Sequence, residues 1–237
     1  MKGKTLLPLS WWKILTIILL FYTFLAGFMA DVPRQNILNE SIRNLYFHVP
    51  MWFGMIILLF VSMVYAIKYL ISNNLKHDTA SVEFANTGIV LGVLGILTGS
   101  VWAKNTWGTF WTNDAKLNMA AIGLLIYFAY LVLRSSFEDE LTRARVSGVI
   151  NIIAYFVLIP LLFILPRMVD SLHPGNGGNP GFNSYDLDNK MRMVFYPAVI
   201  GWTLLGTWIS TLRVRVRNLE NKEELTETMD TASHLIN

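Results

Sequence analysis

The sequence predicts an all-α integral membrane protein with six transmembrane helices, and two observations support this. Apolar residues make up 54% of the 237-residue chain and charged residues only 15%, whereas about a quarter of a soluble domain is charged. The chain also contains six runs of 17 to 24 residues without any charge, and a helix needs roughly 20 apolar residues to cross a bilayer. These features exclude a soluble enzyme with an aqueous core.

The composition excludes further classes of protein. The chain has no cysteine, so disulfides, iron–sulfur clusters and covalent haem attachment through a C-x-x-C-H motif are impossible. It has no Walker A motif and no room for a nucleotide-binding domain. The net charge of +3 comes from residues at the ends of the apolar runs, where membrane topology places them, and does not predict a nucleic-acid partner.

We expect one integral domain over residues 1–237, of which residues 218–237 are a polar, acidic cytoplasmic tail that is either a solvated helix or disordered. The first apolar run could be a signal peptide because it ends in Ala-Gly-Phe-Met-Ala, but Trp11 and Trp12 form an interfacial anchor that favours a retained span. The expected spans are about 12–30, 49–70, 84–103, 117–133, 147–166 and 193–212.

The distribution of basic residues predicts the orientation. Lys2, Lys4 and Lys13 precede the first span without an accompanying acid, and basic residues collect on the cytoplasmic side. With the N-terminus inside, the cytoplasmic segments hold 12 Lys and Arg residues and the outer segments hold 7. Six spans return the chain to the same side, so both termini are predicted to be cytoplasmic.

The third span carries glycines on one helical face, at 88, 92, 95 and 99. Small residues at this spacing let neighbouring helix backbones approach closely. Tight helix packing is the favoured interpretation, and a substrate path is the alternative.

Two of the four histidines are predicted to lie on the outer face. His48 starts the second span beside Pro50, and His173 follows the fifth span beside Pro174. A lone interfacial histidine is usually only a polar tip near the lipid headgroups, but a pair on one face favours metal ligation. His77 and His234 fall on the inner side. The absence of any histidine inside a span argues against the electron carriers that hold haem b between helices.

The connection at 102–117 is rich in aromatic residues. An interfacial belt is one explanation, but the spacing of Trp107, Phe110 and Trp111 would place them on one face of a helical loop. Such a face is a flat apolar platform for a flat aromatic ligand, and Lys104, Asp114 and Lys116 could form its polar edge. The platform residues are Trp102, Trp107, Gly108, Phe110, Trp111 and Asp114.

Residues 107–117, which read WGTFWTNDAKL, resemble the tryptophan-rich WWD signature of haem-handling proteins of cytochrome c maturation. The usual form is W-G-x-W-W-x-W-D-x-R-L, from which this chain departs at Phe110, Asn113 and Lys116. Within that superfamily the size and six spans resemble the haem exporter protein C (CcmC) family. The larger relatives CcmF and CcsA have more spans and more histidines.

The resemblance implies that His48 and His173 are the axial ligands of a non-covalently held b-type haem in transit. The aromatic loop would support the macrocycle. Basic residues on the same face, which the haem propionates would require, are Arg34, Arg43, Lys104 and Lys116.

We therefore expect a multi-pass protein of the bacterial inner membrane that is not an enzyme. It would bind haem on its periplasmic face and deliver it to a haem chaperone, which the resemblance implies is CcmE, with an ABC-type complex of CcmA and CcmB as a further partner. A CcsA-like component that ligates haem to cytochrome c is one alternative. A permease or assembly subunit without a cofactor is the other.

Overall fold

The predicted all-α membrane fold is confirmed by the computed structural model, which describes residues 10–33, 38–173 and 187–236. The described residues contain helices and no strand, and six of the helices are long and apolar enough to cross a membrane. The elements are α1 (Trp11–Met29), η1 (Asn39–Asn44), α2 (Leu45–Ser72), α3 (Leu75–Trp107), α4 (Ala115–Ser135), α5 (Glu140–Phe163), η2 (Leu165–Arg167) and α6 (Asn189–Ile236).

The helices extend beyond the uncharged runs. Helix α3 begins at Leu75 rather than at 84, and α6 continues as helix through the acidic tail. A helix satisfies its own backbone hydrogen bonds wherever it runs, so polar residues prolong it past the apolar segment. The ends are fixed by side chains: Asn74 accepts a hydrogen bond from the Lys76 amide, and Asp139 accepts one from the Thr142 amide.

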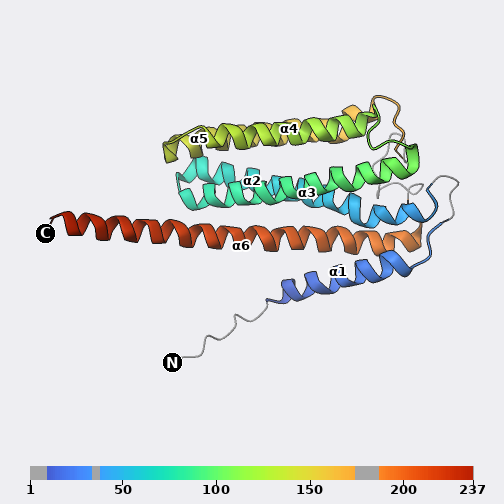
Figure 1. Ribbon diagram of the computed structural model, residues 1–237, viewed down its shortest axis with the longest axis horizontal. Coiled ribbons are helices and arrows are strands. Elements are labelled where there is room, and N and C mark those ends of the chain that lie inside the picture. The colour runs from blue at the N-terminus through green and yellow to red at the C-terminus, as the bar shows by residue number, and fades with distance from the viewer. Residues whose placement is uncertain (1–9, 34–37, 174–186, 237) are drawn as a thin grey trace.

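The helices stack in successive layers (Figure 1). The α4–α5 pair packs on the α2–α3 pair, α6 packs on the other side of α2 and α3, and α1 packs on α6. The short connections 73–74 and 136–139 lie at one end, which we call the short-loop end. The described residues of the other three connections, at 30–33 with 38–44, at 108–114 and at 164–173, lie at the opposite end, which we call the long-loop end.

The glycines of α3 pack against α2, as the favoured interpretation predicted. A Cβ atom added at any of them would come within 3.0 Å of an α2 side chain, so only hydrogen fits. The pairs, from the short-loop end to the long-loop end, are Gly88 with Leu59, Gly92 with Met55, Gly95 with Trp52 and Gly99 with His48.

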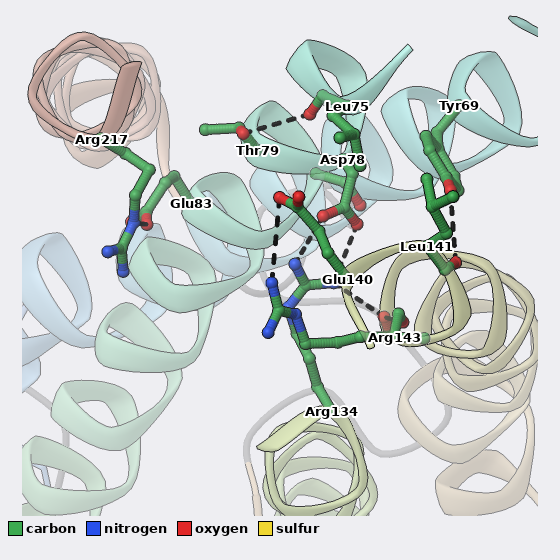
Figure 2. A network of polar contacts seen from close by, with 12 residues as sticks. Tyr69, Leu75, Asp78, Thr79, Glu83, Arg134, Glu140, Leu141, Arg143 and Arg217 are labelled. Carbon is green, nitrogen blue, oxygen red and sulfur yellow. Dashed lines mark hydrogen bonds and ion pairs between the residues drawn. The ribbon is translucent and has the colours of Figure 1, made fainter. Parts of the chain in front are cut away.

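Buried charges join the helices at the short-loop end (Figure 2). The Arg134 guanidinium of α4 donates to both carboxylate oxygens of Asp78 in α3, at 2.8 and 2.5 Å, and to the Ser147 hydroxyl of α5. Glu83 of α3 pairs with Arg213 at 2.6 Å and with Arg217 at 3.8 Å, both on α6. Each buried acid therefore has a basic partner on another helix.

Candidate functional site

His48 lies in the first turns of α2 at the long-loop end, within the helix rather than before it. Its ring rests on Gly99 of α3, where an added Cβ would come within 2.6 Å of the His48 Cε1 atom. Trp52 and Trp102 meet the same ring edge to face, with centroids 6.3 and 6.0 Å away. The imidazole therefore lies between two indole rings, in space that is available because residue 99, the last glycine of the α3 face, has no side chain.

The His48 ring is also fixed by a hydrogen bond. Its Nδ1 atom lies 3.1 Å from the Thr98 hydroxyl oxygen. That hydroxyl donates to the carbonyl of Leu94, at 2.8 Å. The packing and this contact together define both the position and the rotation of the ring.

His173 lies in the connection after η2 and is held by Asp114 at the start of α4. The His173 Nδ1 atom is 2.9 Å from Asp114 Oδ1, and the Asp114 side chain is 1% exposed. The carboxylate also accepts hydrogen bonds from the amides of Lys116 and Leu172 and from the Ser171 hydroxyl. Asp114 thus caps α4 and anchors residues 171–173 to the aromatic loop.

The charge states of this pair follow from burial and contact. Burial would raise the pKa of Asp114, but His173 and the donated hydrogen bonds outweigh it and hold the pKa below its ordinary value. Burial lowers the pKa of His173, and Lys116 adds to the decrease, while Asp114 opposes it. Because an ordinary histidine has a pKa of about 6.5, the His173 imidazole is neutral at pH 7 beside an ionised Asp114.

The two predicted ligands come together in space. His48 and His173 are separated by 124 residues in the sequence, yet the imidazoles are close enough to interact electrostatically. Trp107 packs against the His173 ring with centroids 5.0 Å apart. Two imidazoles and the rings of Trp102 and Trp107 therefore share one end of the bundle.

The aromatic loop does not have the helical form that the residue spacing suggested. Helix α3 ends at Trp107, because Gly108 adopts a left-handed conformation with φ of 82° and closes the helix. Phe110 and Trp111 follow in non-helical chain and are 59% and 43% exposed. Both rings are exposed outside any helix, so the prediction of one helical face was wrong.

Polar contacts fix the shape of this loop. The Trp111 indole donates to the Asn118 side chain at 3.3 Å, and the Asn118 amide donates to Asn113 at 2.7 Å. Asn113 occupies a position at which the WWD signature has a tryptophan. Its side-chain oxygen accepts a hydrogen bond from Asn118 in the first turn of α4, and it provides no aromatic ring.

The four basic residues predicted on this face differ in placement. Arg34 lies outside the described residues. Arg43 donates to the carbonyls of Gly27 and Ala30 and to Glu40, so it caps the end of α1. The Lys104 ammonium donates to the Gly108 carbonyl and lies over the Phe110 ring.

Lys116 has a different setting. Its ammonium is buried, and it is near enough to His173 to act on that imidazole electrostatically. Lys104 and Lys116 are thus the described lysines associated with the aromatic loop and with His173.

Sequence reasoning missed the groups that hold the histidines. Thr98 and Ser171 gave no signal, because isolated hydroxyl residues near a span end are common. Asp114 was predicted to form the edge of a ligand platform, whereas its carboxylate turns inward to His173. An aspartate directly before a helix, two residues ahead of Lys116, is typical of an N-cap. This signal could have indicated that the Asp114 side chain binds the protein backbone rather than a ligand.

The donor set limits what the site can bind. Among the described residues, no group of three or more His, Cys, Asp or Glu side chains could hold a bare metal ion. Two imidazoles suit a metal whose remaining ligands arrive with it, and haem iron takes axial histidines in this way. The surrounding indole rings match a flat apolar macrocycle, so His48 and His173 fit a haem.

Comparisons with known proteins agree with this chemistry. The family model described as "Heme exporter protein C" matches residues 3–229. The chain is 25% identical over 214 residues to Heme exporter protein C of Escherichia coli K12, covering 87% of this chain and 82% of that protein. It is 26% identical to the Haemophilus influenzae protein of the same name, with the same coverage, and 26% identical to that of Rhodobacter capsulatus, covering 91% and 90%.

Proposed function

Because the chain belongs to the heme exporter protein C family, which handles haem in cytochrome c maturation, we propose that it holds haem at the long-loop end of its bundle and passes it on. His48 and His173 are the axial ligands in this proposal. The observation that carries it is the convergence of these two imidazoles beside Trp102 and Trp107. Each histidine has a fixed ring, so the pair is organised before haem arrives.

The remaining groups have supporting roles in the proposal. The exposed rings of Phe110 and Trp111 offer an apolar surface, and a large aromatic side chain buries roughly 150–250 Å² on contact. Lys104 at the aromatic loop and Lys116 near His173 are the proposed cations for the haem propionates, and Lys104 would exchange its bond to the Gly108 carbonyl for one to a propionate. Arg43 is the weaker candidate because α1 already uses its guanidinium.

Delivery is proposed from the same arrangement. The protein binds and transfers haem and makes no covalent bond, so it is not an enzyme. The site faces the periplasm at the inner membrane, a haem chaperone such as CcmE accepts the haem, and a CcmA/CcmB complex supplies the energy for release. The haem is b-type and non-covalent, because the chain has no cysteine to form a thioether.

The first prediction tests the histidines. Detergent-purified protein is titrated with ferric haem, and its absorption spectrum is compared with those of His48→Ala and His173→Ala. Each single variant should lose one axial ligand, shift the Soret and visible bands and lower cytochrome c maturation in cells. The double variant should lose more haem than either single variant, after correction for protein abundance.

His77→Ala is the matched control. Its imidazole lies at the short-loop end, hydrogen-bonded to the Ser72 hydroxyl, so neither spectrum nor maturation should change. Unchanged spectra and normal maturation in both His48→Ala and His173→Ala would contradict the site. A wild-type protein that takes up no haem would favour the permease alternative.

A further inference from the structure

Both proposed ligands have one ring nitrogen already engaged, and it is Nδ1 in each. The hydroxyl of Thr98 has a single hydrogen, which it donates to the Leu94 carbonyl. Its oxygen can then only accept from His48 Nδ1, 3.1 Å away. With Thr98 as the acceptor, an uncharged His48 ring has its proton on Nδ1 and its lone pair on Nε2.

The same reasoning applies to His173, with a different partner. An ionised carboxylate is only an acceptor, so Asp114 receives the Nδ1 proton across 2.9 Å. The Asp114 carboxylate is held in place by the Leu172 amide at 2.7 Å and the Ser171 hydroxyl at 2.8 Å. His173 therefore also has its lone pair on Nε2.

We infer that Thr98 and Asp114 are positioning residues that present both Nε2 atoms to the haem iron, and that Asp114 makes His173 the stronger of the two ligands. This inference rests on the proposed function. A carboxylate on the far nitrogen of a metal-bound histidine fixes the tautomer and raises the basicity of the ligand. Thr98 supplies only a neutral oxygen, so the two axial bonds are unequal in strength.

The inequality has a consequence for transfer. A histidine ligand that is made more basic by a neighbouring anion stabilises ferric iron more than ferrous iron. The charge of Asp114 would therefore lower the midpoint potential of the bound haem. The weaker bond to His48 would be the one that an accepting protein displaces first. His48 lies on α2 against Gly99 of α3, whereas His173 lies on the connection that Asp114 anchors.

Asp114→Asn tests this inference in the full-length, haem-loaded protein. The side chain keeps its size and one acceptor oxygen for His173, but it loses the charge and the second oxygen, which accepts from Ser171 and Leu172. We expect the midpoint potential of the haem to rise and haem affinity to fall by about 10- to 100-fold, as for other partners of metal-bound histidines. Ser171→Ala is the control, because it removes one anchor of the same connection and leaves the carboxylate on His173.

Thr98 gives a second test that does not disturb the loop. Thr98→Val keeps the volume but removes the acceptor, and it should add a high-spin fraction to the spectrum as His48 loses its fixed tautomer. Thr98→Ser should restore the wild-type spectrum.

Equal haem loss in Asp114→Asn and Ser171→Ala, with an unchanged potential in both, would reduce Asp114 to a structural cap and overturn the inference. A wild-type protein that binds no haem would overturn the proposed function as well. A normal wild-type spectrum whose potential does not respond to Asp114→Asn would overturn the inference alone.

Discussion

At the scale of single residues, neighbours decide what each histidine does. His77 lies against Tyr65, with its Nδ1 atom at the Ser72 hydroxyl, in exposed surroundings at the short-loop end. His48 has the same side chain but rests on a glycine between two indole rings. The residue type supplies a ligand, and the packing around it supplies the orientation.

Gly99→Ala is a prediction at this scale. The added methyl group would stand 2.6 Å from His48 Cε1, so the ring must move, since protein interiors leave no room for one more carbon. We expect weaker haem retention and altered Soret and visible bands at near-normal abundance, measured by absorption spectroscopy of the purified variant.

Gly148→Ala is its matched control. The nearest atom to an added Cβ there is a Leu70 side-chain carbon at 3.6 Å, which is an ordinary contact. The same change within a helix should therefore leave the spectrum untouched. If Gly99→Ala also left it untouched, Gly99 would not determine the position of His48.

At the scale of elements, ion pairs of buried acids connect helices that the apolar runs alone could not arrange. The pair Asp78–Arg134 links α3 to α4, and Glu83 links α3 to α6 (Figure 2). Removing one partner of a buried pair leaves the other charge buried without a counter-charge, which lowers the free energy of unfolding by roughly 3–5 kcal/mol. An exposed pair such as Glu140–Arg143, at 3.9 Å, contributes only about 0–1 kcal/mol.

Arg134→Gln should therefore lower the thermal unfolding temperature in detergent far more than Arg143→Gln. Asp78→Asn combined with Arg134→Gln should recover part of the loss, because two amides can hydrogen-bond without a charge. Monodispersity after heating, followed by size-exclusion chromatography, measures the effect. Equal unfolding temperatures for Arg134→Gln and wild type would show that the pair does not stabilise the bundle.

At the scale of the whole molecule, the long loops lie together because they are alternate connections, after α1, α3 and α5, between helices that cross in opposite directions. The connection 108–114 and residues 164–173 lie at the same end of the bundle (Figure 1). Helix α6 has 48 residues and is about 72 Å long at 1.5 Å per residue, so it crosses the roughly 30 Å hydrocarbon core and projects beyond the short-loop end.

Reporter fusions test this arrangement. Fusions at Asn113 and at Asn179, which lies outside the described residues, should both report the outer compartment. Fusions at Asn73 and Ser135 should report the cytoplasm, because basic residues concentrate on that side. Opposite locations for Asn113 and Asn179 would make a site shared by the two connections impossible.

The sequence by itself determined the membrane class, the number of spans and the two candidate ligands. The bilayer requires each span to be apolar over about 20 residues. The spans can therefore be recognised without knowing how the helices pack. The prediction that the glycine face packs tightly followed from the same local logic, and the structure confirms it at His48, Trp52, Met55 and Leu59. Helix ends were predicted less well, because polar residues prolong a helix without any apolar signal.

Only the tertiary structure decided how the site is assembled. It ended α3 at Gly108 and so corrected the helical form expected for Phe110 and Trp111. It also turned Asp114 inward and placed Thr98 beside His48. These contacts join residues up to 59 positions apart, and hydrogen bonds between distant segments depend on helix packing, which no local pattern of residues encodes.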